Sequence, residues 1–258
     1  MTNPPFPKKI PKRLVAHEDL RIDEFYWLRD DKRKNSKVLN YLKDENEYTD
    51  YWFKENKVDS KKIFKKYKNS IPKFEEGFKT SIDEYQYFST SSSSQEYRKH
   101  YRIFNKKKKL ILDINKLSKN KSFFSISGIY PSRNHNYIAY GEDTSGRREY
   151  SIVVKDISNN RNIEKNVCSS SGTIIWNKSS NGYFYLKKDP KTLISSSLYF
   201  HKLGTSLKKD KLIYKEEDNQ FNLSISLSRT KKYLLLEISK TESNEIRYID
   251  LEDESFPL

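Results

Sequence analysis

The sequence predicts a mainly β protein in which an N-terminal extended arm and helices, over residues 1–71, precede about four blades of a β-propeller, over residues 72–258. Prolines cluster near the start, and a helical period of apolar residues follows them. Beyond Pro72, short aromatic and β-branched runs recur at a nearly constant spacing. The chain is long enough to bury a sizeable core.

The first 34 residues carry Pro4, Pro5, Pro7 and Pro11, which exclude a helix and predict an extended arm. An apolar, aromatic stretch then stands out in polar surroundings. We expect this stretch to pack against another domain, because such a surface is rarely left to solvent. Its members are Phe25, Tyr26, Trp27 and Leu28.

Two helices are expected before Pro72. The first begins at Ser36 as the N-cap, and the second begins near Asp59 or Ser60. Apolar residues recur at helical spacing in both segments. In the first they are Val38, Leu39, Leu42, Trp52 and Phe53, and in the second they are Ile63, Phe64 and Tyr67.

An internal repeat organises the remainder of the chain. Similar strand-like runs start near residues 85, 137, 183 and 233, as "YQYF", "YIAY", "YFYL" and "YLLL". Each later copy follows a polar turn and precedes a second strand. A unit of roughly 50 residues built from antiparallel strands is typical of propeller blades. The last visible unit stops soon after its second strand, so we expect a truncated array.

The composition limits the possible partners. The formal net charge is +15, but lysines greatly outnumber arginines. Such a charge attracts nucleic acid or anionic membranes without specificity, so we expect neither as a specific partner. The basic run from Lys106 is interpreted as a solvated hairpin turn. A single cysteine, Cys168, expected to be buried, excludes an internal disulfide and suits a reducing compartment.

Residues that could carry catalysis are not found. The seven glycines never form a G-x-S-x-G elbow around a serine. His17, His100, His135 and His201 are scattered, without metal-binding spacing, and are interpreted as strand or turn residues. We therefore expect no catalytic residue, no metal and no cofactor in this chain.

Several segments resemble one family. "KKIPKRLVAHEDLRIDEFYWLRDD", "IAYGEDTSGRREYSIVVKDI" and "SNEIRYIDLED" are similar to the N-terminal part of the prolyl oligopeptidase family of serine peptidases, and within it to the oligopeptidase B group. The resemblance covers essentially the whole chain and is weakest around residues 75–125.

The resemblance implies a cytoplasmic enzyme nearly three times this length, with a seven-bladed propeller over a C-terminal α/β-hydrolase domain. That domain carries the Ser-Asp-His triad and the acidic pocket that directs cleavage of short peptides after Lys or Arg. The propeller admits flexible peptides and excludes folded proteins. The chain would thus be truncated before its catalytic partner domain, and we expect it to be inactive alone.

Two adjacent arginines, Arg147 and Arg148, follow Gly146 at an expected hairpin turn. Neighbours on a strand point to opposite faces, so one can pair within the propeller while the other points elsewhere. The resemblance places this segment near the domain interface. An ion pair from one of them to the hydrolase domain is the hypothesis that follows.

Two other functions remain open. A stand-alone propeller-type binding or scaffold protein would leave two blade faces uncovered, which favours association or aggregation. A nucleic-acid-binding protein would rest on charge alone.

Overall fold

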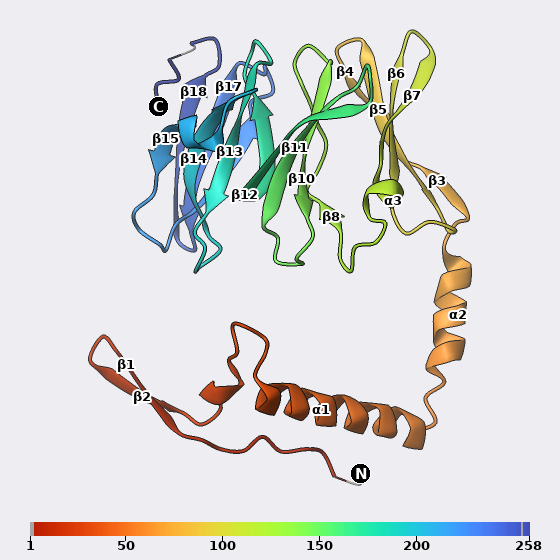
Figure 1. Cartoon of the computed structure of the whole chain (residues 1–258), viewed down its shortest axis with the longest axis vertical. Helices are drawn as coiled ribbons and strands as arrows, with labels where there is room; N and C mark the ends of the chain where they lie inside the picture. The colour runs from red at the N-terminus through yellow and green to blue at the C-terminus, as the bar shows by residue number, and fades with distance from the viewer. Residues whose placement is uncertain (1–2, 254) are drawn as a thin grey trace. The chain divides into compact units, whose positions relative to one another are not determined.

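The computed structural model describes residues 3–253 and 255–258, which divide into two compact units, Met1–Pro72 and Lys73–Leu258. Each unit is described by itself. The second consists almost entirely of antiparallel strands (Figure 1). The expected mainly β propeller architecture is confirmed.

The first unit is less extended than the sequence suggested. Its arm folds back as a short antiparallel hairpin and then forms one 3-10 turn before the helices. The first helix is capped by Asn35, whose side chain accepts a hydrogen bond from the Lys37 backbone, and not by Ser36 as expected. Asp59 caps the second helix. The elements are β1 Lys12–Ala16, β2 Asp19–Asp23, η1 Tyr26–Leu28, α1 Ser36–Glu55 and α2 Ser60–Ser70.

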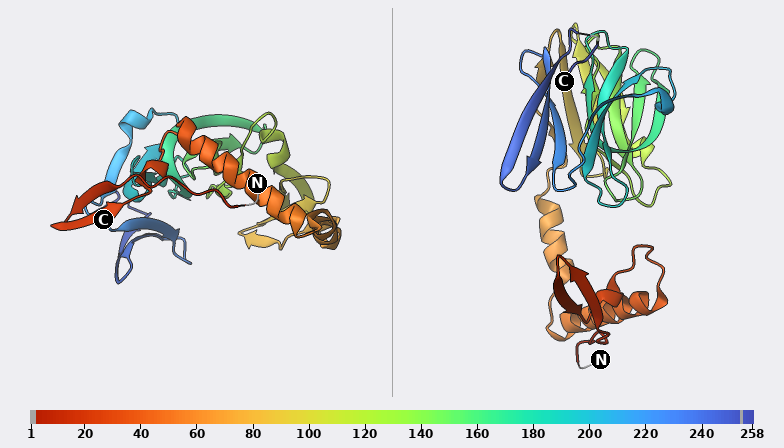
Figure 2. Two further views of the ribbon diagram at one scale, coloured as in Figure 1. Left: turned by 90° about the horizontal axis from the view of Figure 1, so that it is seen from below. Right: turned by 90° about the vertical axis from the view of Figure 1, so that its left-hand side faces the viewer.

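The second unit contains three antiparallel sheets of five, eight and three strands, which form four blades that fan around an arc (Figure 2). Blade 1 has its inner strand in two pieces, followed by three longer strands. Asn105 and Lys106, both with positive φ, form its hairpin turn, whereas the remainder of the basic run, Lys107 to Lys109, lies on β7 and not in the turn as expected. Blade 1 comprises β3 Phe74–Glu76, β4 Thr80–Ile82, β5 Tyr85–Ser92, β6 Lys99–Phe104 and β7 Lys107–Asp113, and α3 Ile114–Leu117 follows it.

Blades 2 and 3 share one long strand. The first part of β12 pairs with β11 at the outer edge of blade 2, and its last part pairs with β13 as the inner strand of blade 3. The strand turns between them at Gly172, whose φ is +87° and whose backbone approaches Ser127 so closely that a Cβ would overlap it. The strands are β8 Ser125–Ile126, β9 Tyr130–Pro131, β10 Tyr137–Asp143, β11 Tyr150–Asp156, β12 Arg161–Trp176, β13 Gly182–Lys188, β14 Ser195–Lys202 and β15 Lys211–Lys215, with η2 Leu207–Lys209.

Blade 4 has three strands within the described residues. These are β16 Asn222–Leu227, β17 Tyr233–Lys240 and β18 Ser243–Asp250. The repeated runs noted in the sequence fall on the second strand of each blade. Their inner strands, β4, β9, the end of β12 and β16, precede them and line the centre of the arc.

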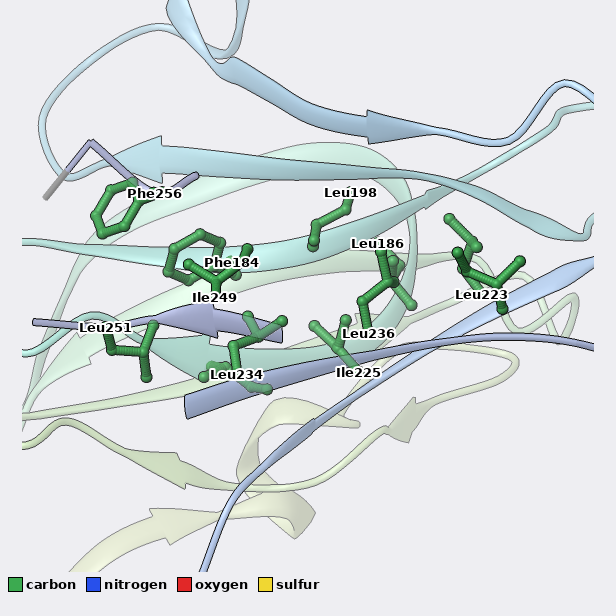
Figure 3. Close-up of a cluster of buried hydrophobic side chains, with 12 residues drawn as sticks. Phe184, Leu186, Leu198, Leu223, Ile225, Leu234, Leu236, Ile249, Leu251 and Phe256 are labelled. Atoms are coloured by element: carbon green, nitrogen blue, oxygen red, sulfur yellow. The ribbon is translucent and has the colours of Figure 1, made fainter. Parts of the chain in front are cut away.

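The hydrophobic core lies in the seams between blades. One cluster joins blades 1 and 2, a second joins blades 2 and 3, and a third joins blades 3 and 4. In the third, Phe184 and Leu198 from blade 3 meet Leu234 and Ile249 from blade 4 (Figure 3). Each fully buried aliphatic side chain of this kind contributes roughly 1.5–3 kcal/mol.

We expect Leu236→Ala to lower the free energy of unfolding of the second unit by about 2–5 kcal/mol, because Leu236 is fully buried in the third seam. Urea denaturation followed by circular dichroism measures the loss. Val167→Ala is the matched control, because Val167 is 78% exposed on β12, and it should change stability by less than about 0.5 kcal/mol. Similar losses in both variants would contradict a core located in the seams.

Candidate functional site

The hairpin loop between β10 and β11 is organised by one carboxylate. Asp143 is only 1% exposed. Its Oδ1 accepts hydrogen bonds from the Ser145 amide at 2.7 Å, the Ser145 hydroxyl at 2.8 Å and the Gly146 amide at 3.1 Å. Its Oδ2 accepts from the Arg148 amide at 2.8 Å. Burial alone would raise the pKa of Asp143, but these hydrogen bonds outweigh it and lower the pKa. The loop is therefore held by an ionised, fully bonded side chain.

Two residues of this loop adopt left-handed backbone conformations. Gly146 has φ +76°, which glycine tolerates without cost. Arg148 has φ +57°, a conformation uncommon for a residue with a side chain. The bond from the Arg148 amide to Asp143 keeps this backbone in place, so the loop fixes the point from which the Arg148 side chain extends.

The two arginines differ in their partners. Arg147 Nε lies 3.2 Å from Glu149 Oε2, and its side chain is 47% exposed, so this ion pair contributes little stability. The Arg148 carbonyl accepts a hydrogen bond from Lys188 Nζ at 2.8 Å. Among residues 3–253 and 255–258, no carboxylate lies within ion-pair distance of the exposed Arg148 guanidinium. Arg148 is thus the one with charge available to another molecule or domain.

Strand pairing gives the position of this loop in the blade. β10 runs antiparallel to β8, and Asp143 lies opposite Ser125 at the start of that inner strand. In blade 1 the inner strand β3 also begins opposite the end of the second strand, where Phe74 pairs with Ser92 of β5. The chain enters the propeller at this end of blade 1. The loop that carries Arg148 therefore lies at the end of the blades where the chain enters the propeller.

The aromatic stretch of the arm is partly anchored within the first unit. Trp27 Nε1 donates to the Lys8 carbonyl at 2.7 Å, and the Trp27 ring meets Tyr41 on α1 edge-on. Lys12 Nζ lies 3.5 Å from the centre of the Tyr26 ring. Phe25 is 40% exposed, while Leu28 is partly buried. Phe25 is the member of this stretch most available for contact elsewhere.

The helices present a larger apolar surface that the sequence interpretation did not assign to a function. Val38 is the one apolar side chain in the described part of the first unit that is buried. The sequence showed the helical spacing of the other apolar residues in these helices, but it did not show that their side chains are exposed. The exposed members are Leu39, Leu42, Trp52 and Phe53 on α1, and Ile63, Phe64 and Tyr67 on α2.

The described residues do not assemble a hydrolytic centre. No serine hydroxyl among them is hydrogen-bonded to a histidine ring, and no cluster of three or more His, Cys, Asp or Glu side chains within them suits a metal ion. Cys168 is only partly buried, contrary to expectation, and burial raises the pKa of its thiol to about 11, so the thiol is unreactive. No helix in this part of the chain is long and apolar enough to cross a membrane.

Comparisons with known proteins agree with this arrangement. The dipeptidyl aminopeptidase BI of Pseudoxanthomonas mexicana is 30% identical, over 95% of this chain and 36% of that protein. Protease 2 of Moraxella lacunata is 26% identical, over 98% of this chain and 38% of that protein. The structure of oligopeptidase B from Leishmania major superposes with a TM-score of 0.90 at 24% identity, over 98% of this chain and 38% of the other.

The chain therefore spans little more than a third of the length of these relatives. The family model for the prolyl oligopeptidase N-terminal β-propeller domain matches residues 4–258. A match over nearly the whole chain shows that this protein belongs to the prolyl oligopeptidase family, of which it represents the N-terminal propeller portion.

Proposed function

We propose that this chain is the propeller portion of an oligopeptidase B-like serine endopeptidase that cleaves short peptides after Lys or Arg in the cytoplasm. The catalytic α/β-hydrolase domain is its partner and lies outside this sequence. The observation that carries the proposal is the match of the propeller family model to residues 4–258, together with the 0.90 TM-score to an oligopeptidase B.

The role of the propeller in this proposal is to restrict access. The inner strands of the four blades line a hollow of about 390 Å³, with mostly apolar walls that include Ile129, Ile174 and Ile225. An ion pair of 2.8 Å between Asp83 in blade 1 and Lys231 in blade 4 lies beside it. A space of this size accommodates a few side chains of a flexible peptide and is far too small for a folded domain.

The proposed contacts with the hydrolase domain are Arg148 and the exposed apolar side chains of the first unit. An unpaired arginine on a fixed loop suits a carboxylate of the partner domain. Phe25, with the exposed faces of α1 and α2, supplies apolar area. Tyr26 and Trp27 have contacts within the first unit, and Arg147 is paired with Glu149 in the hairpin.

A second candidate activity is the removal of dipeptides from free N-termini. The 30% identity to a dipeptidyl aminopeptidase favours it. An endopeptidase accepts a substrate whose N-terminus is blocked, whereas an enzyme that removes dipeptides requires a free N-terminus. This difference is determined where the substrate contacts the catalytic domain. A non-catalytic binding or scaffold protein remains the alternative from another class.

Purified alone, this chain should neither hydrolyse a peptide substrate containing Lys or Arg nor react with a serine-directed fluorophosphonate, because no serine hydroxyl among the described residues is hydrogen-bonded to a histidine that could activate it. Grafted in place of the corresponding N-terminal 38% of Moraxella lacunata Protease 2, it should yield an enzyme that cleaves N-terminally blocked substrates after Lys or Arg. Cleavage only after a free N-terminal dipeptide would favour the second activity. A folded chimera without any activity would count against an enzymatic role.

In the same chimera, Arg148→Ala should lower kcat/KM about tenfold, because the carboxylate of the catalytic domain that is proposed to contact Arg148 loses its partner. Arg147→Ala is the control, because that guanidinium already pairs with Glu149 and should change kcat/KM less than about twofold. Urea denaturation of the isolated chain should be nearly unchanged by either substitution. Equal effects of the two variants on kcat/KM would show that Arg148 has no special role.

A further inference from the structure

A fully buried histidine lies at the seam between blades 2 and 3, away from the contacts assigned above. His201 on β14 is 0% exposed. Its Nδ1 lies 2.7 Å from Asp210 Oδ1, and its Nε2 lies 2.9 Å from Glu164 Oε1. The side chains of Asp210 and Glu164 are 1% and 12% exposed. One imidazole therefore has a buried carboxylate at each ring nitrogen.

The two carboxylates belong to different blades. Glu164 lies on the first part of β12, opposite Val154 of β11, in the outer strand of blade 2. Asp210 follows η2 and precedes β15, at the outer edge of blade 3. His201 is paired with Tyr183 of β13 in the same blade. The contact from His201 to Glu164 therefore crosses the seam.

The other titratable groups around this contact are neutral. The Tyr185 hydroxyl donates to Asp210 Oδ2 at 2.8 Å, and the Tyr183 ring lies 5.1 Å from the imidazole. Burial, above all, raises the pKa of both phenols and of the Cys168 thiol on β12. Asn166 Nδ2 donates to the Tyr183 hydroxyl at 2.9 Å and also lies 3.2 Å from His201 Nε2. No cation among the described residues lies within ion-pair distance of either carboxylate except His201 itself.

The protonation of His201 follows from these contacts. A neutral imidazole has one N–H, so its second nitrogen would turn a lone pair toward a carboxylate in a medium of low dielectric. An imidazolium donates to both carboxylates at once. Burial alone would lower the pKa of His201, but the hydrogen bonds to Glu164 and Asp210 outweigh it and raise the pKa.

We propose that His201 is an imidazolium that locks the outer strand of blade 2 to blade 3 through Glu164 and Asp210, and that this lock releases when the pH rises. The second oxygen of Glu164 is buried and has no hydrogen-bond partner in the described structure. Removal of the His201 proton would leave two buried carboxylates without a counterion, a state that folded proteins avoid.

The direction of the pH dependence follows from the raised pKa. In the unfolded chain the pKa of histidine is about 6.5. The contribution of the lock to stability is complete below that value and is lost as the pH rises through the higher pKa of the folded state. Between the two values, the unfolding equilibrium constant should rise by up to about tenfold per pH unit.

One substitution separates a proton lock from ordinary packing. In E164Q the side chain keeps its shape, and its amide N–H can donate to a neutral Nε2. The contact then no longer requires a titrating proton. E164Q should therefore fold, and its stability should depend much less on pH between 6.5 and 9 than that of the unsubstituted chain.

The test uses the full chain with Trp27→Phe and Trp52→Phe, so that fluorescence reports on Trp176, which lies in the core of this seam. Urea midpoints are measured from pH 6 to 9, with and without E164Q. In parallel, nitrogen NMR of ¹⁵N-histidine-labelled protein over the same pH range should show that both ring nitrogens of His201 stay protonated above pH 6.5, the ordinary pKa of histidine. Its signals are identified by their loss in H201Q, and H17Q, in the exposed β1–β2 turn, is the control.

A His201 ring that is already neutral at pH 6.5 would overturn the proposal. It would equally be overturned by a urea midpoint that does not fall between pH 6.5 and 9, or by the same fall in E164Q as in the unsubstituted chain. A fall in the unsubstituted chain that E164Q suppresses would support it.

Discussion

Burial of sheet faces against one another is the interaction on which this propeller depends. Each of the three hydrophobic clusters draws its residues from two neighbouring blades, so no blade has a core of its own. A blade is therefore positioned by its neighbours, and so are the loops at its ends. The first unit lacks such a seam: Val38 is its one buried apolar residue in the described part of the chain. Its helices expose apolar side chains along α1 and α2.

The same constraint explains how much of the fold the sequence could predict. The second strands of blades 2 and 3 are covered on both faces, with six consecutive buried residues in β10 and five in β13, so these strands appear as dense aromatic and aliphatic runs. Those runs repeat visibly. The inner strands β8 and β9 have two residues each, and β12 passes from one blade into the next at Gly172. Such strands produce no periodic pattern in the sequence. The four blades could therefore be predicted, but the strand that blades 2 and 3 share could not.

Prediction of the candidate site was limited for a related reason. Gly146 and the adjacent arginines identified the hairpin, because turn chemistry is local in sequence. The sequence could not show which of the two arginines forms an ion pair. That depends on the left-handed backbone conformation at Arg148 and on the hydrogen bonds that Asp143 accepts across the loop. The partners of His201 lie 37 and 9 residues away from it, so no spacing indicated them. The environment of His201 is therefore created by the fold, and its position in the sequence predicts only a strand residue.

The seam between blades 2 and 3 connects the buried histidine to the arginine loop. Beside its apolar contacts it has directional bonds between charged groups, which fix one register of the two blades. Glu164 belongs to the strand that pairs with β11, and β11 begins directly after the loop that carries Arg148. The contact with His201 therefore fixes the outer half of blade 2, and with it the loop, relative to blade 3. The contact proposed between Arg148 and a carboxylate of the hydrolase domain gains from such a fixed support, because less orientational freedom is lost on contact.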